Sequence, residues 1–260
     1  MDIVINSELS LLFILILVGV GFTAGFVDSI AGGGGLISLP GLLLLGIPPT
    51  MALGTNKLAS SFGTMVSFLT FYRQGKIDKP LMKILFPISF AFACGGAYLA
   101  TRIPTPYLKP IIISFLVSTT VFILLKKDWG VSNTYADNRR SMTIGVLVAT
   151  ICGFYDGFVG PGTGTFLVFA FIYMGFDFVM AAGNAKAVNL ASNLAALGIF
   201  IVTGHVNYIY ALFMMAGTLT GSFFGARLAI LKGSKFVRII FILVSCTMIG
   251  KLLIDYILTL

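Results

Sequence analysis

The chain has 260 residues, of which 58% are hydrophobic and only 10% are charged, and its mean hydropathy is +1.03. Because a soluble domain needs roughly 25% charged residues to cover its surface, the composition excludes a water-exposed fold and predicts a membrane protein. The net charge of +8 comes from basic residues scattered singly or in pairs, a pattern that does not indicate a nucleic-acid partner.

Apolar runs of about 17 or more residues, long enough to cross ~30 Å of hydrocarbon as helices, occur eight times along the chain. None alternates like a barrel strand, so the sequence predicts an all-α polytopic membrane protein with the lipid bilayer as its surroundings. The first run has no Lys or Arg ahead of it and is interpreted as a retained span rather than a signal peptide. The predicted spans are 9–27, 51–72, 81–100, 108–125, 142–158, 178–202, 208–226 and 236–254.

Two further apolar stretches, 35–47 and 165–173, are too short to span a membrane alone, and each follows a glycine-rich turn. A helix of about 9 to 13 residues covers only ~14 to 20 Å. If such a helix crosses, one of its ends must stop inside the membrane. We therefore expect two half-helices.

The two glycine-rich turns belong to an internal repeat. The segment GFVDSIAGGGGLI, from Gly25, aligns after one gap with GFYDGFVGPGTGTF, from Gly153, so that Asp28 matches Asp156. Downstream, LGTNKLASS aligns with AGNAKAVNLAS, and Lys57 matches Lys186. The sequence thus predicts a first transmembrane repeat (1–125), a polar cytoplasmic linker (126–141) and a second repeat (142–260), with about five segments in each repeat.

The distribution of Lys and Arg predicts how the repeats are oriented. Connections 73–83, 126–140 and 227–238 each carry four basic residues, and the remaining helix ends carry only Arg102 and Lys109. If the short segments cross, the three basic connections share one side. This arrangement predicts inverted repeats with both termini outside.

The glycine turns are candidate anion-binding sites. A helix amino terminus inside the membrane points unpaired N–H groups and a positive dipole end at whatever occupies the site. Glycine permits close approach of a ligand, and nearby hydroxyl groups add donors. The alternative is that the glycines only allow close helix packing.

Four ionisable residues lie inside apolar segments at matched positions, namely Asp28, Lys57, Asp156 and Lys186. Charges at such depth usually face a pathway or a partner. In the crossing arrangement, each lysine lies at the depth of the other repeat's glycine turn and can complete the anion site there. Alternatively, each lysine neutralises an aspartate in a structural ion pair. The aspartates are candidate proton-coupling residues, and whether the pairs take part in transport stays open.

Asparagines near these lysines are candidates to orient a ligand by hydrogen bonds. With three cysteines in apolar stretches and a single histidine, we predict no cofactor, no metal site and no disulfide framework. The candidate ligand-binding residues are Gly32, Gly33, Gly34, Gly35, Ser38, Asn56, Lys57, Gly160, Gly162, Thr163, Gly164, Thr165, Asn184, Lys186 and Asn189.

The motifs DSIAGGGGLISLP and GFVGPGTGTFL, together with the turns around Lys57 and Lys186, resemble those of the TauE/SafE family of membrane permeases. The resemblance covers nearly the whole chain. It implies export of a small anion, usually oxidised sulfur such as sulfite or a small organosulfonate, across the cytoplasmic membrane of a prokaryote. The second turn departs from GGGG at Pro161 and Thr163, so the two turns need not have identical roles.

The sequence therefore predicts a secondary transporter rather than an enzyme, because inverted repeats with broken helices are typical of such proteins. Two alternatives stay open: an intramembrane aspartyl hydrolase that uses Asp28 and Asp156, and a passive anion channel. The sequence leaves open the identity of the anion, the coupling ion, the direction of net flux and whether the chain forms a homo-oligomer.

Overall fold

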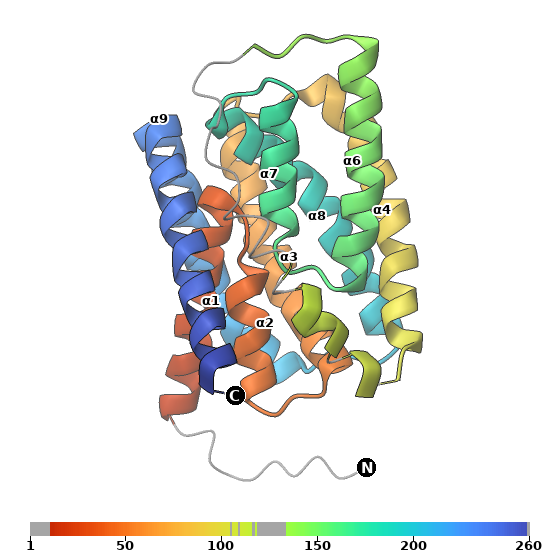
Figure 1. Ribbon diagram of the computed structural model, residues 1–260, viewed down its shortest axis with the longest axis vertical. Coiled ribbons are helices and arrows are strands. Elements are labelled where there is room, and N and C mark those ends of the chain that lie inside the picture. The colour runs from red at the N-terminus through yellow and green to blue at the C-terminus, as the bar shows by residue number, and fades with distance from the viewer. Residues whose placement is uncertain (1–10, 105, 109, 116–117, 119–133, 259–260) are drawn as a thin grey trace.

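The computed structural model describes residues 11–104, 106–108, 110–115, 118 and 134–258, with side chains as far as residue 233. In these ranges every regular element is an α-helix, and the helices form an elongated bundle (Figure 1). They are α1 (Leu11–Ala31), α2 (Gly35–Leu44), α3 (Pro49–Arg73), α4 (Lys79–Arg102), α6 (Arg139–Phe158), α7 (Thr163–Tyr173), α8 (Phe178–Val202) and α9 (Tyr208–Leu258).

The helix positions follow the apolar runs closely, and the run predicted at 178–202 coincides with α8. Polar capping residues mark the first turns of two helices. The side chain of Asp177 accepts hydrogen bonds from two backbone N–H groups of α8, and the side chain of Asp78 accepts one from the first turn of α4. Such caps satisfy N–H groups that lack a partner within the helix. The predicted span 108–125 lies largely outside the described residues.

The two spans predicted at 208–226 and 236–254 correspond to two helices that meet at Gly233, without the longer loop that was expected between them. Helix α9 is continuous except at Gly233, whose φ of 73° and ψ of −170° are not helical. A straight helix of 51 residues would be about 77 Å long. Instead the chain turns back at Gly233, and α9 ends near the end of the bundle at which α1 begins (Figure 1).

Both predicted half-helices are present. Helix α2 has 10 residues and α7 has 11. Each begins in the interior of the bundle and runs back to the end from which the preceding long helix came (Figure 1). The amino termini of α2 and α7 therefore lie at the centre of the molecule.

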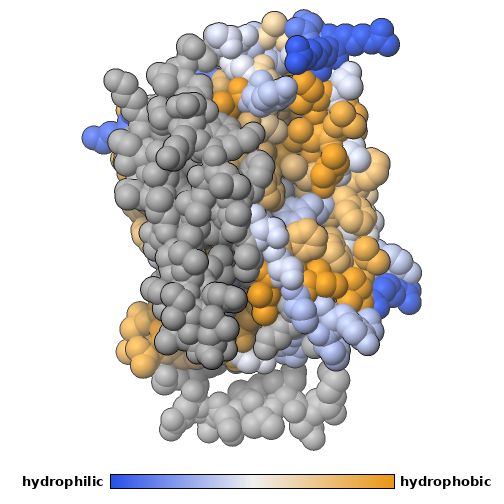
Figure 2. Space-filling model, in the orientation of Figure 1, coloured by the Kyte–Doolittle hydropathy of each residue, from blue (hydrophilic) through white to orange (hydrophobic). Residues whose placement is uncertain are grey.

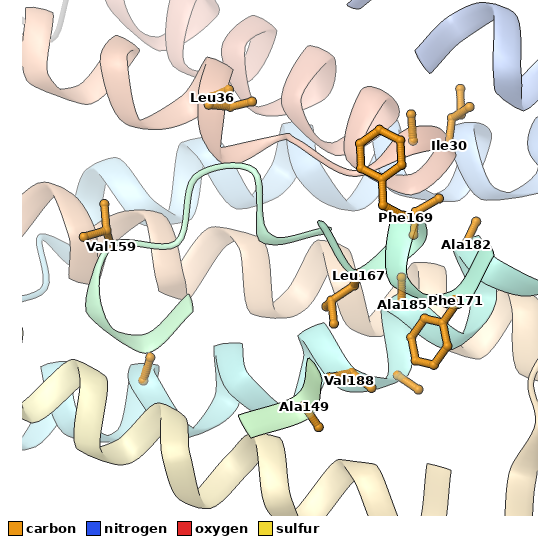
Figure 3. Close-up of a cluster of buried hydrophobic side chains, with 14 of the residues drawn as sticks. Ile30, Leu36, Ala149, Val159, Leu167, Phe169, Phe171, Ala182, Ala185 and Val188 are labelled. Carbon is orange, nitrogen blue, oxygen red and sulfur yellow. The ribbon is translucent and has the colours of Figure 1, made fainter. Parts of the chain in front are cut away.

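Glycine allows the long helices to pack closely. Helix α1 packs along α9, and α4 packs along α6. A Cβ atom on Gly221 of α9 would lie 2.1 Å from the backbone oxygen of Phe22, and one on Gly157 of α6 would lie 2.1 Å from that of Ala93. Helices α3 and α8 cross between these pairs, and α8 contributes much of the buried apolar cluster in Figure 3.

The described linker residues dock on the helix ends at one end of the bundle. The N–H of Thr134 donates a hydrogen bond to the oxygen of Gly175, and the ring of Tyr135 stacks on that of Phe176 with centroids 4.0 Å apart. Burial first, and the negative charges of Asp78 and Asp137 second, raise the pKa of the Tyr135 hydroxyl. Residues 134–137 therefore form part of the folded structure.

The outer surface is apolar. Leu12, Leu147, Ile151 and many other large hydrophobic side chains are exposed, and Figure 2 shows hydrophobic residues over much of the coloured face, with the most hydrophilic ones toward its ends. Five helical stretches of the described residues are long and apolar enough to cross a membrane: α1, α4, α6, α8 and the first part of α9. The chain is thus a multi-pass membrane protein.

Candidate functional site

The two glycine-rich turns meet at the centre of the bundle. The connection from Ile30 to Leu36 passes beside the one from Val159 to Leu167 (Figure 3). Gly32 and Gly33 have φ values of 77° and 86°, and Gly160 and Gly162 have values of 89° and 82°. Residues with a Cβ atom rarely adopt such backbone angles. A Cβ on Gly32 would lie 2.3 Å from the backbone nitrogen of Thr165, so the turns touch.

Two ion pairs lie beside these turns, and each joins the two halves of the chain. The Nζ atom of Lys57 is 2.8 Å from Oδ2 of Asp156, and Nζ of Lys186 is 2.5 Å from Oδ2 of Asp28. Lys57, Asp156 and Lys186 have buried side chains, and Asp28 is partly buried, with 17% of its side chain exposed. Each lysine thus lies by the turn of the other half and is also paired with an aspartate there.

Further hydrogen bonds hold the Lys57–Asp156 pair in place. Oδ2 of Asp156 accepts from the hydroxyl of Ser192 at 2.6 Å and from the amide of Asn189 at 3.3 Å. Nζ of Lys57 donates to Oδ1 of Asn193 at 2.8 Å. Because hydrogen bonds compensate for the loss of water around buried charges, these partners stabilise the pair.

Asp28 has a different environment, at the junction of the turns. Its Oδ1 accepts a hydrogen bond from the N–H of Gly34 at 3.2 Å, so the carboxylate lies at the amino end of α2. A Cβ on Gly164 would lie 3.3 Å from the same oxygen. The negative side chain thus occupies a position that a helix amino terminus favours.

A small cavity lies between the turns and helices α3, α8 and α9, with about 40 Å³ accessible to the centres of water molecules. A water needs roughly 10 to 15 Å³ by this measure, so the cavity has room for a few waters or one small ion. The predicted site residues that line it are Asp28, Gly33, Gly34, Gly35, Ser38, Asn56, Lys57, Asp156, Gly160, Gly162, Gly164 and Asn189.

Five predicted site residues do not line the cavity. Lys186 is fully buried, and Gly32 contacts the other turn. The hydroxyls of Thr163 and Thr165, expected to be ligand donors, donate instead to the backbone oxygens of Gly160 and Ala31. Asn184 accepts a hydrogen bond from the N–H of Asp78, in the connection between α3 and α4. In this structure these residues make internal contacts, although Nδ2 of Asn184 is buried without a hydrogen-bond partner among the described residues.

Several residues that line the cavity were not predicted from the sequence. The cavity also contacts Ala24, Gly25, Ser60, Gly63, Thr64, Asn193, Thr218 and Ser222. Helical spacing was the available signal, since residues four apart share a face: Asn189 is followed by Asn193, Ser60 by Thr64, and Thr218 by Ser222.

Some residues that line this cavity carry hydrogen-bond donors without partners among the described residues. Asn56 is 7% exposed and its Oδ1 accepts from Ser38, but its amide nitrogen has no hydrogen-bond partner among the described residues. In the same ranges no partner is found for the N–H groups of Gly33, Gly35, Gly162 and Gly164. A surplus of donors around a small cavity suits an anion.

Residues 17–252 match the family model described as "Sulfite exporter TauE/SafE". The chain belongs to the TauE/SafE family. This membership confirms the resemblance seen in the glycine turns and around the two lysines.

TauE/SafE relatives from several bacteria are similar over most of their length. The chain is 37% identical to the "Probable membrane transporter protein ORF9" of Sinorhizobium, with 90% of each chain covered. It is 35% identical to a "Probable membrane transporter protein" of Haemophilus influenzae, covering 92% of this chain and 94% of that one. It is 34% identical to the "Probable membrane transporter protein YfcA" of Escherichia coli K12, with coverages of 91% and 88%. No solved structure matches the chain.

The names of these TauE/SafE relatives describe membrane transporters and not enzymes. They support the transporter interpretation over the intramembrane hydrolase. The names give no substrate, and the family description gives sulfite.

Proposed function

We propose that this protein is a secondary transporter that exports a small anion, sulfite or a small organosulfonate, across the bacterial cytoplasmic membrane. The observation that carries the proposal is the cavity between two broken helices, which is lined by Lys57, by Asn56 with its unpaired amide, and by glycines whose N–H groups have no partner among the described residues. Converging donors at helix amino termini favour an anion. The family description supports an oxidised sulfur compound.

The two halves are inverted repeats in this proposal, related by a two-fold axis in the membrane plane. Reciprocal contacts support it: Gly54 of α3 packs against the backbone of His205, after α8, and Gly183 of α8 packs against the backbone of Lys76, after α3. The ion pairs are reciprocal too, because each lysine meets the aspartate of the other half. Alternating exposure of the cavity would then follow from rocking of one half against the other.

The proposal also orients the protein. The end of α3, the start of α6 and the turn at Gly233 share one end of the bundle (Figure 1), and this end carries Arg73, Lys76, Arg139, Arg140 and Lys232. Because cytoplasmic connections are rich in Lys and Arg, we place this end in the cytoplasm.

Single cysteines test the orientation. In a variant with Cys94, Cys152 and Cys246 replaced by Ser, Gln74→Cys lies at the basic end and Val202→Cys at the opposite end. We expect a membrane-impermeant maleimide to label Val202→Cys on intact cells, and Gln74→Cys only after the membrane is opened. Labelling of Gln74→Cys on intact cells would refute this orientation.

Anion flux tests the function itself. Proteoliposomes containing the full chain should exchange sulfite faster than protein-free vesicles, with saturation. A panel of sulfite, sulfate, thiosulfate, sulfoacetate and small carboxylates ranks the substrates. An enzyme is excluded if the anions are recovered unchanged, and a channel is excluded if an excess of unlabelled anion on the far side accelerates exchange. No protein-dependent flux of any of these anions would overturn the proposal.

A proton is the coupling ion that the site supports, with Asp28 and Asp156 as candidate carriers, because both carboxyl groups line the cavity. An imposed pH gradient should then accelerate flux beyond the effect of pH on the anion itself. Flux that ignores the gradient would remove the coupling and leave the anion site standing.

A further inference from the structure

The two lysine–aspartate pairs have the same chemistry but different surroundings, and the difference bears on which part of the cavity holds the anion. The inference rests on the proposed anion transport. The sequence repeat makes the pairs equivalent, whereas the structure does not.

Lys57 faces the cavity, and its neighbours there are polar. Its Nζ atom is 2.8 Å from Oδ2 of Asp156 and 2.8 Å from Oδ1 of Asn193. Because an ammonium group has three N–H donors, one N–H is left for a ligand. Asn56, the preceding residue on α3, lines the same cavity with an amide nitrogen that has no partner among the described residues. A ligand at this place would find a positive charge and a free donor side by side.

Lys186 is enclosed instead. Its side chain is fully buried, it does not line the cavity, and Asp28 is the polar partner found for it in the described structure. In the repeat, the residue that matches Asn56 is Ala185, which has no side-chain donor. The Lys186–Asp28 pair is therefore enclosed by packed side chains on its lysine side and offers no ligand site there.

The two glycine turns also differ in whether a carboxylate accepts their backbone N–H groups. The carboxylate of Asp28 accepts the N–H of Gly34 and so lies at the amino end of α2, where its negative charge disfavours a second anion. Asp156 also lies close to its own turn, 3.2 Å from a Cβ placed on Gly160, but its partners are side chains of α3 and α8, and no backbone N–H of the described turn donates to its carboxylate. The N–H groups of Gly162 and Gly164 keep no partner among the described residues.

We propose that the protein has one anion site, on the Lys57 side, formed by the amino end of α7, the amide of Asn56 and the ammonium of Lys57. The Asp28–Lys186 pair is a fixed link that ties the junction of the turns to α8. Asp28 acts as a built-in anion at the amino end of α2, which leaves Asp156 as the candidate proton carrier of the two aspartates. Duplication thus supplied two turns, of which one binds the substrate and the other is closed by a carboxylate.

Two double variants that keep the net charge test this division: Lys57→Gln with Asp156→Asn, and Asp28→Asn with Lys186→Gln. Each is purified as the full chain in detergent, its fold is checked by circular dichroism and gel filtration, and sulfite is titrated calorimetrically without oxygen. Thiosulfate and sulfoacetate are titrated in the same way. Because a charged hydrogen bond to the ligand is lost only in the first variant, we expect its Kd to rise at least tenfold more than that of the second.

Equal losses in the two variants, or a larger loss in the second, would overturn the single-site proposal. Absence of saturable binding of all three anions to the wild-type protein would overturn the proposed function itself. If the first double variant does not fold, Asn56→Ala keeps both ion pairs and takes its place, with Asn184→Ala, outside the cavity, as its matched control. Asn56→Ala should raise the Kd severalfold more than Asn184→Ala, and an equal effect would again refute the proposal.

Discussion

Replacing Lys186 alone by Gln is expected to lower the free energy of unfolding by about 3 to 5 kcal/mol, because it leaves the carboxylate of Asp28 buried without its partner. Asp28 is 17% exposed and its remaining hydrogen bond comes from one backbone N–H, which is too little to compensate for the lost ammonium. The midpoint of thermal unfolding in detergent measures the effect.

The control for Lys186→Gln is the same change combined with Asp28→Asn. The double variant removes both charges and lets two amides hydrogen-bond, so most of the lost stability should return. Because breaking a buried pair costs more than replacing it, a double variant as unstable as the single one would show that Lys186 acts through packing and not through its charge.

Replacing Gly32 by Ala is expected to have a second large effect, because two costs add at this position. A residue with a Cβ pays about 1 to 2 kcal/mol for the left-handed backbone conformation, and the φ of Gly32 is 77°. The new Cβ would also lie 2.3 Å from backbone atoms of Gly164 and Thr165, which forces the two turns apart at a further cost of about 3 kcal/mol.

Gly46 offers a matched control for this prediction. Its φ of 76° is nearly the same, but a Cβ there would have no atom within 4 Å. Gly46→Ala therefore reports the backbone cost alone. Thermal unfolding and anion flux should both be much more impaired in Gly32→Ala than in Gly46→Ala. Similar values would show that the turns do not need to touch.

Much of the helical architecture follows from the sequence by itself. Lipid requires about 20 apolar residues for a helix to span it, and this requirement leaves long, easily recognised runs such as 178–202, which is α8. The half-helices are recognisable because short apolar stretches follow glycine turns that no regular helix accommodates. The connection between the last two predicted spans was expected at 227–238, but the sequence did not show that it would consist of one non-helical residue, Gly233.

At the site, the sequence alone identifies two glycine turns, two lysines and two aspartates at duplicated positions. The partners depend on the fold, because Lys186 and Asp28 are 158 positions apart and pair through the crossing of the two halves. The tertiary structure decided that Lys57 faces a cavity while Lys186 is enclosed. A repeat in the sequence fixes matching residue types, but the packing of neighbouring side chains fixes which groups remain free to bind a ligand.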